Sequence, residues 1–182
     1  AVTKSVAVYY DWDDFSTAAK KEVLTNPLLS SNVSALSVSP HTKVNSNLYV
    51  GTTGGNLLKL IVKSPTDVTW SEITSSDFVG SISDIEFGKT EDELFVTFHN
   101  YGVKSVFYSP DGGSTWSNKE GNLPDIPVRC ILQNPVVPEE VIIGTELGTW
   151  RTQNFSAATP TWVQSNNGMT EVRVTDLDMR DD

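Results

Sequence analysis

Three tryptophans recur at a constant interval along this sequence. Trp70, Trp116 and Trp162 are each separated by 46 residues, and each directly follows a threonine. A period of roughly 20–50 residues is typical of proteins in which one supersecondary unit is stacked repeatedly. The interval therefore restricts the chain to folds that are built from similar consecutive units of this length.

Short apolar segments recur at nearly the same interval upstream of the tryptophans. One set begins each unit, and its members start at Val33, Ile82, Val128 and Val174. A second set follows in the first three units and starts at Leu48, Leu94 and Val141. Runs this short, rich in β-branched residues and bounded by turn residues, are typical of β-strands.

Each unit is predicted to contain four antiparallel strands. A glycine turn at Gly55, Gly102 or Gly148 separates the second strand from the third, and the threonine–tryptophan pair is expected on the fourth. Four strands in about 46 residues match one β-propeller blade. A single blade cannot bury both of its faces, so neighbouring blades must stack on it. We therefore predict an all-β propeller fold, with inter-blade packing anchored by Trp70, Trp116 and Trp162.

These boundaries divide the chain into three complete blades and a partial blade at each end. The complete blades are predicted at residues 33–81, 82–127 and 128–173. Residues 174–182 are expected to supply the first strand of a following blade. We expect the chain to belong to a propeller of seven or eight blades, whose remaining blades come from the same polypeptide or from a second copy.

Residues 1–32 are predicted to supply the third and fourth strands of a preceding blade. These strands are expected at Ser5–Tyr10 and Lys21–Leu24, with an enlarged turn over residues 11–20. Propensity alone would allow a helix at 17–24. The similarity of residues 14–19 to residues 154–158, about three repeats later, favours the strand interpretation. Trp12, in the enlarged turn, is expected to contact a neighbouring blade.

One eight-residue segment carries a specific turn motif. Residues 109–116, SPDGGSTW, fit the Asp-box pattern S-x-D-x-G-x-T-W at every defined position. A short acidic side chain can accept backbone N–H groups within such a turn, and glycine permits a positive φ. We therefore interpret the motif as a structural turn without a catalytic role, formed by Ser109, Asp111, Gly113, Thr115 and Trp116.

With this motif and this repeat, the chain resembles the BNR/Asp-box propeller superfamily. That superfamily includes sialidases, xyloglucanase-type glycoside hydrolases and sortilin-like receptor domains. The segment from Asn134 to Thr152 is most similar to repeats of large secreted bacterial proteins. The resemblance implies an extracellular or cell-surface location. The favoured function is a non-catalytic module of an exported protein that acts as a scaffold or recognises a protein or a glycan. The alternative is a fragment of a glycoside hydrolase of the xyloglucanase or sialidase type.

Two aspartates are candidates for a polar site in the predicted central channel. Asp84 and Asp176 occupy the same position in the first strands ISDIEF and VTDLDM. Such carboxylates can bind a cation or a polar ligand, or act as a catalytic pair when about 5–9.5 Å apart. Hydrogen bonding to loop backbone or channel water is the favoured interpretation.

Two further groups of residues are weaker candidates. Arg129 and Arg173 lie at the start of successive first strands, where a sialidase-like site would need an arginine cluster, but no Arg-Ile-Pro signature accompanies them. His99 and Tyr101 lie in an enlarged turn of the second complete blade. That turn is predicted to be neutral or to contact a partner or a sugar.

Composition excludes several other classes of protein. The net charge of −10 argues against binding to the phosphates of nucleic acid or to anionic lipid. His41 and His99 are far apart and Cys130 is the single cysteine, so we expect no metal site, intrachain disulfide or cofactor. No apolar run approaches the ~20 residues of a membrane helix, so no membrane insertion is expected.

Overall fold

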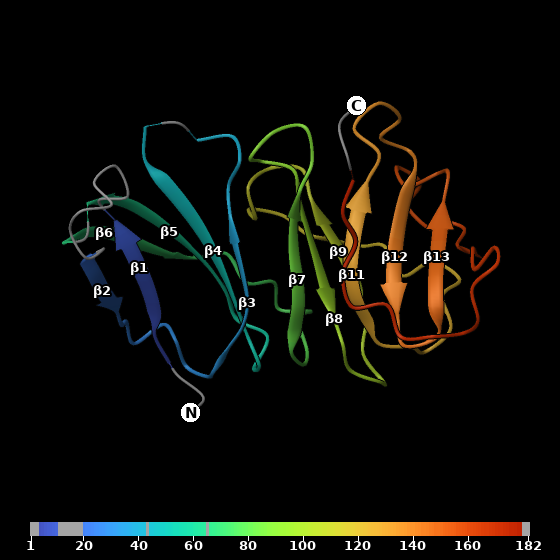
Figure 1. Cartoon of the computed structure of the whole chain (residues 1–182), viewed down its shortest axis with the longest axis horizontal. Coiled ribbons are helices and arrows are strands. Elements are labelled where there is room, and N and C mark those ends of the chain that lie inside the picture. Colours follow the sequence, from blue (N-terminus) through green and yellow to red (C-terminus); the bar gives the residue numbers. More distant parts are fainter. Residues whose placement is uncertain (1–3, 11–19, 43, 65, 180–182) are drawn as a thin grey trace.

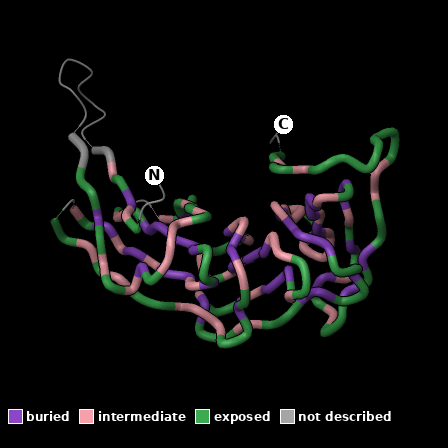
Figure 2. The backbone as a smooth tube through the Cα atoms, turned by 90° about the horizontal axis from the view of Figure 1, so that it is seen from below, coloured by how far each residue is buried: buried purple, intermediate pink, exposed green. Residues whose placement is uncertain are grey.

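The computed structural model describes residues 4–10, 20–42, 44–64 and 66–179. Within these ranges every regular element is a β-strand, and the strands form antiparallel sheets (Figure 1). None of these residues forms a helix of the length and apolarity that a bilayer crossing requires. The sheets follow one another along an arc from the N-terminus to the C-terminus (Figures 1 and 2). The predicted all-β fold with four-stranded antiparallel sheets is confirmed.

Three sheets have four strands each, and within each sheet neighbouring strands are consecutive in sequence. The first contains β3 (Val33–Val38), β4 (Ser46–Thr52), β5 (Leu57–Ser64) and β6 (Asp67–Glu72). The second contains β7 (Ile82–Phe87), β8 (Leu94–Phe98), β9 (Val106–Ser109) and β10 (Ser117–Asn118). The third contains β11 (Val128–Gln133), β12 (Val141–Thr145), β13 (Gly148–Thr152) and β14 (Val163–Gln164).

A two-stranded sheet precedes these three. It consists of β1 (Val6–Tyr10) and β2 (Lys20–Leu24), which pair antiparallel. The two strands lie where the repeat predicts them, and residues 20–24 are a strand rather than part of a helix. Most of the predicted enlarged turn, including Trp12, lies outside the described residues.

Two expectations about the strands are corrected by the structure. Residues 174–179 are not a strand, because no neighbouring strand among the described residues offers them a ladder of hydrogen bonds. The segment is instead held at its start, where the N–H of Val174 donates to the carbonyl of Thr145 at 2.9 Å. Trp70 lies within β6 as expected, whereas Trp116 and Trp162 directly precede the short strands β10 and β14.

The hydrophobic core is divided into three clusters, one between each pair of adjacent sheets. Val6 and Leu24 of the two-stranded sheet pack on the β3–β6 sheet, and Trp70 packs against this cluster. The second cluster joins the β3–β6 and β7–β10 sheets. The third joins the β7–β10 and β11–β14 sheets and includes Trp162. Apolar area removed from water between sheets is thus the main force that holds the arc together.

Two tryptophans make the same hydrogen bond at successive seams. Nε1 of Trp116 donates to the carbonyl of Ile73 at 2.9 Å, and Nε1 of Trp162 donates to the carbonyl of Lys119 at 3.0 Å. Each acceptor is the residue that directly follows the fourth strand of the preceding sheet. The repeated geometry satisfies the indole N–H while the ring fills the space between sheets.

Candidate functional site

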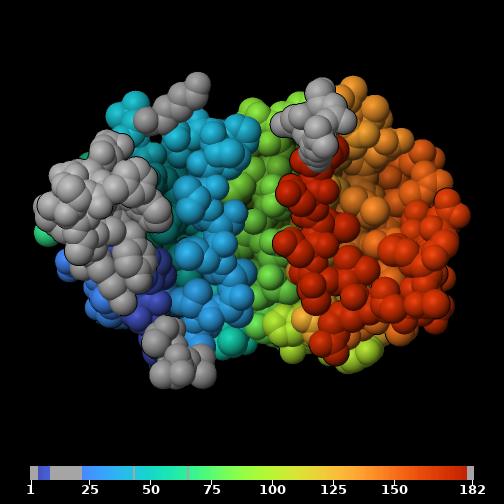
Figure 3. Space-filling view, in the orientation of Figure 1, coloured from blue at the N-terminus to red at the C-terminus, as the bar shows by residue number. Residues whose placement is uncertain are grey.

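The first strands of the sheets and the C-terminal segment lie on one face of the molecule. β3, β7 and segment 174–179 are all visible on this face in Figures 1 and 3. This arrangement brings acidic side chains of β7 close to those of the segment. We call Asp84, Glu86, Asp176 and Asp178 the channel carboxylates.

Both carboxylate oxygens of Asp84 accept hydrogen bonds from backbone N–H groups. Oδ1 accepts the N–H of Ile85 at 2.9 Å, and Oδ2 accepts the N–H of Ile131 in the next sheet at 3.0 Å. The neighbouring Ser83 hydroxyl donates to the carbonyl of Val128 at 2.7 Å. The two side chains therefore hold the start of β7 against β11. Burial raises the pKa of Asp84, although these two backbone hydrogen bonds act against the shift.

Asp176 repeats only half of this arrangement. Its Oδ1 accepts the N–H of Leu177 at 2.9 Å, and its side chain is exposed. Burial is the largest cause of a raised pKa at Glu86, and the charges of Asp84, Asp176 and Asp178 raise it further. The channel carboxylates therefore interact with one another. No group of three or more His, Cys, Asp or Glu residues with metal-binding geometry occurs among the described residues.

Cys130 occupies the position of Asp84 in β11. Its thiol is buried, and burial, followed by the charge of Asp84, raises its pKa to about 12. The thiol is therefore protonated at neutral pH, which makes it a poor nucleophile and a poor metal ligand.

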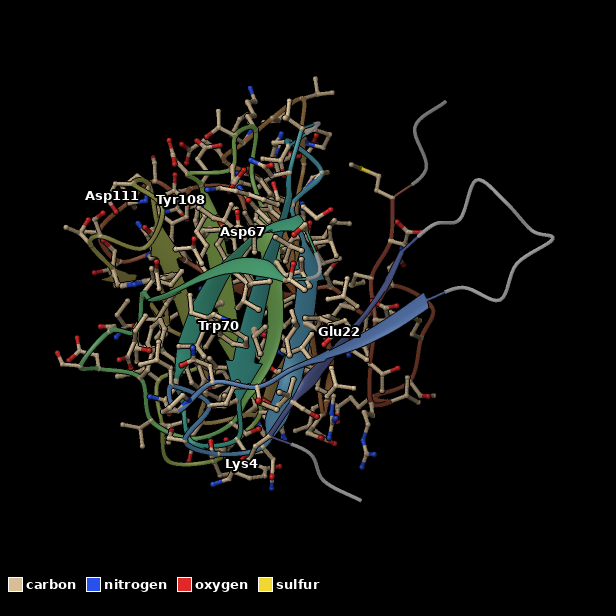
Figure 4. The ribbon with its side chains drawn as sticks, turned by 90° about the vertical axis from the view of Figure 1, so that its left-hand side faces the viewer. Lys4, Glu22, Asp67, Trp70, Tyr108 and Asp111 are labelled. Carbon is tan, nitrogen blue, oxygen red and sulfur yellow. The ribbon has the colours of Figure 1, made fainter. Side chains whose placement is uncertain are left out.

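The Asp-box lies away from the channel carboxylates, and its groups bond to one another. Figure 4 shows Asp111 on the opposite side of the molecule from the C-terminal segment. Oδ1 of Asp111 accepts the N–H of Thr115 at 2.8 Å, and Oδ2 accepts the Thr115 hydroxyl at 2.7 Å. The Ser109 hydroxyl donates to Oδ1 at 2.9 Å and accepts the N–H of Gly113 at 2.8 Å. The bond from the Thr115 N–H is the main reason that the pKa of Asp111 is lowered.

Asn154 performs a similar role in the longer turn that precedes Trp162. Its Oδ1 accepts the N–H of Thr161 at 2.9 Å and the hydroxyl of Thr152 at 2.8 Å. An amide oxygen thus replaces the carboxylate across a turn of different length. Both contacts are internal to the turn, which indicates a turn-forming function.

The structure brings the two predicted arginines together on one glutamate. Nε of Arg129 donates to Oε1 of Glu146 at 2.6 Å, and Nε of Arg173 donates to Oε2 at 2.8 Å. Burial alone would raise the pKa of Glu146, but the hydrogen bonds from Arg129 and Arg173 outweigh it and lower the pKa. Two cations on one anion leave this arginine–glutamate cluster with one excess positive charge.

His99 lies near this cluster, in the turn between β8 and β9 that also contains Tyr101. Burial, followed by the charge of Arg129, lowers the pKa of His99, which is therefore neutral at pH 7. The Tyr101 side chain is exposed. Sequence reasoning selected the arginines, His99 and Tyr101 separately but missed Glu146. The signal for Glu146 was its position in a turn between two strands, directly beside the start of β11.

Comparison with known proteins tests the fold. No protein-family model matches the sequence, and no curated protein matches it. A solved structure, the GH74 enzyme of Niastella koreensis, matches with a TM-score of 0.61 and 14% identity over 92% of this chain. The fold is that of a β-propeller. The chain covers 27% of the length of the Niastella enzyme. In a propeller a blade is a four-stranded antiparallel sheet, which matches each of the three four-stranded sheets of this structure.

The two candidate sites differ in what they can do chemically. In the propeller channel, the Asp84 oxygens are occupied by backbone N–H groups of two blades. At the arginine–glutamate cluster, the side chain of Arg173 is 60% exposed and only its Nε bonds to Glu146, so other guanidinium N–H donors are available to solvent or a ligand. The cluster is therefore the better candidate for binding a polar molecule.

Proposed function

We propose that the chain is a non-catalytic part of an extracellular BNR/Asp-box propeller and that it recognises a glycan at the arginine–glutamate cluster. The Asp-box pattern and the internal hydrogen bonds of Asp111 support the superfamily assignment. The resemblance to repeats of secreted proteins supports the location. The single observation that carries the non-catalytic assignment is the double backbone bonding of Asp84.

Glycan recognition is supported by the residues around the cluster. Planar guanidinium groups donate several hydrogen bonds in a fixed geometry, which suits the hydroxyl and carboxylate oxygens of sugars. Tyr101 is 64% exposed in the neighbouring turn and offers an amphipathic ring for stacking. Glu146 holds Arg129 and Arg173 in place before any ligand arrives. Such preorganisation lowers the entropic cost of binding.

A glycoside hydrolase is the second candidate function. It is favoured by the structural likeness to the Niastella GH74 enzyme. A hydrolase needs two carboxyl groups on either side of the glycosidic bond. Asp84 lies in β7 and Asp176 in segment 174–179, and the two are close enough to interact, as the effect of Asp176 on the pKa of Asp84 indicates. Against this function, an oxygen that accepts a backbone N–H is less available to a substrate.

The test is a glycan panel screened with the full chain for binding and for release of reducing sugar. We expect binding without cleavage, and we expect Arg173→Ala to weaken binding about tenfold or more. Arg151→Ala is the matched control, because Arg151 is an exposed arginine outside the cluster. Cleavage that Asp84→Ala abolishes would favour the hydrolase. Equal effects of the two arginine substitutions would contradict recognition at the cluster.

A further inference from the structure

In the first strands β7 and β11, one backbone N–H after the bulge donates to a carboxylate rather than to the neighbouring strand. β3, β7 and β11 all have a bulge near their start, and Leu36, Ile85 and Ile131 hold the same place after it. In β7 the N–H of Ile85 donates to Asp84 of the same strand. In β11, where Cys130 replaces the aspartate, the N–H of Ile131 donates to Asp84 of the preceding blade. One aspartate thus serves its own blade and the next one.

β3 has no aspartate of its own at this place. Ala35 occupies the position of Asp84, as Cys130 does in β11, so β3 supplies no carboxylate of its own for the N–H of Leu36. Segment 174–179 carries an aspartate, Asp176, at the corresponding position. Oδ1 of Asp176 already accepts the N–H of Leu177, as Oδ1 of Asp84 accepts that of Ile85. Its Oδ2 corresponds to the atom with which Asp84 reaches the next blade.

Burial of the apolar side chains shows the same difference. Leu36 is 53% exposed, whereas its counterparts Ile85 and Ile131 are each 1% exposed. Val38 is 57% exposed, whereas its counterpart Phe87 is 8% exposed. The counterparts in β7 and β11 are covered by the preceding blade. β3 therefore presents an exposed apolar surface, whereas the equivalent surfaces of β7 and β11 are covered by a neighbouring blade.

We propose that this surface of β3 binds segment 174–179 of a second copy of the chain, with Asp176 of one copy accepting the N–H of Leu36 of the other. The four successive positions are Ala35, Asp84, Cys130 and Asp176. A second copy continues this alternation, because its Ala35 follows Asp176 as Cys130 follows Asp84. The proposed contact is therefore of the same type as the seam between the β7–β10 and β11–β14 blades.

The shape of the molecule fits such a pairing. Figure 2 shows the chain as an arc, with the two-stranded sheet and the C-terminal segment both on its open side. A head-to-tail contact between different surfaces closes into a ring when the rotation allows it, and otherwise produces a filament. β3 and segment 174–179, the two proposed contact surfaces, lie on the same face in Figures 1 and 3, so two copies can join through two identical contacts.

The molar mass in solution tests this proposal. We expect sedimentation equilibrium of the full chain at increasing concentration to approach twice the monomer mass of 19.9 kDa. Asp176→Ala removes the shared acceptor, and Leu36→Glu places a charge in the apolar contact. Each is expected to raise the dissociation constant about tenfold or more. Leu36 is exposed in the single chain, so Leu36→Glu leaves monomer folding largely unchanged.

Two matched controls separate this contact from general effects of charge. Asp178→Ala removes the neighbouring carboxylate of the same segment, and Val136→Glu places a charge on a valine that is 83% exposed in the β11–β12 turn. Both are expected to associate like the unsubstituted chain. The proposal is overturned if the unsubstituted chain remains a monomer at every concentration. It is equally overturned if Asp176→Ala and Leu36→Glu associate as strongly as the controls, with circular dichroism showing that all four variants are folded.

Discussion

Asp84 and Ile131 join two neighbouring blades directly, through a hydrogen bond of 3.0 Å between the carboxylate of one and the backbone N–H of the other. The two residues are 47 positions apart, and β11 has Cys130 where β7 has Asp84, so it offers the Ile131 N–H no carboxylate of its own. A buried N–H that loses its partner carries the full cost of its desolvation. The bond therefore stabilises the seam and leaves the carboxylate less free for chemistry.

The stability contributed by Asp84 is expected to depend on pH. Burial raises its folded-state pKa above the usual aspartate value of about 3.9, so the folded state binds the proton more tightly. The advantage of the unsubstituted chain over Asp84→Ala should be full below that unfolded value and decline as pH rises through the folded-state pKa. Urea midpoints of both chains between pH 3 and 7, in roughly half-unit steps, measure this difference. An advantage that grows with pH would contradict the prediction.

Glu91 is expected to show the opposite pH dependence. It contacts Lys59 at 2.8 Å and accepts hydrogen bonds from Asn47 at 2.6 Å and Tyr49 at 2.9 Å. Burial alone would raise its pKa, but these three partners outweigh it and lower the pKa. Its contribution should be present above the unfolded value of about 4.3 and be lost as pH falls through the folded-state pKa.

The size of this effect can be measured by substitution. Glu91→Ala leaves the buried Tyr49 hydroxyl without its acceptor and should reduce the free energy of unfolding by about 2–3 kcal/mol at pH 7. Asp92→Ala, at the exposed neighbouring position, should change it by less than about 0.5 kcal/mol. Similar losses in both variants would show that Glu91 does not connect the two blades.

Two tryptophans of the third blade should respond differently to substitution by phenylalanine. Trp162→Phe removes the indole N–H that bonds to Lys119 and leaves a gap at a side chain that is 1% exposed, so we expect a loss of about 1–3 kcal/mol. Nε1 of Trp150 is buried without a hydrogen-bond partner among the described residues. Trp150→Phe removes this unpaired group and should be neutral or stabilising. Chemical denaturation of both variants checks the difference, and equal losses would refute it.

Adjacent glycines of the Asp-box should differ in their tolerance of alanine. Both have positive φ, 67° at Gly112 and 91° at Gly113. A Cβ at Gly113 would approach Ile73 of the preceding blade at 2.8 Å, whereas one at Gly112 would meet only Oδ1 of Asp92 at 3.2 Å. Gly112→Ala should therefore cost about 1 kcal/mol from its backbone conformation, and Gly113→Ala about 1–3 kcal/mol more. Equal melting temperatures would show that the turn is not pressed against its neighbour.

Much of the architecture was predictable because local patterns repeat. The even placement of Trp70, Trp116 and Trp162 and the alternation of short apolar runs with turn residues led to the correct sheets. The repeat also correctly predicted the strand β2, where residue propensities alone would have allowed a helix. Residues 174–179 were predicted wrongly as a strand, because a strand depends on its hydrogen-bonded neighbours as well as on its own side chains.

The candidate site was less predictable, because its residues are far apart in sequence and meet only in the folded chain. Arg129 and Arg173 were chosen for their position in the repeat, but their meeting on Glu146 depends on how the start of β11, the β12–β13 turn and the segment after β14 pack together. Asp84 and Asp176 looked equivalent in sequence. The structure distinguishes them, since Asp84 reaches Ile131 and Asp176 is exposed.

By itself, then, the sequence determined the repeating unit, its strand order and the Asp-box turn, since these depend on contacts between residues close together in the chain. Only the tertiary structure decided which oxygen of each carboxylate is occupied and which apolar side chains of β3 remain uncovered. Those properties arise where one blade meets another, and the distance between blades is set by packing that no single unit encodes.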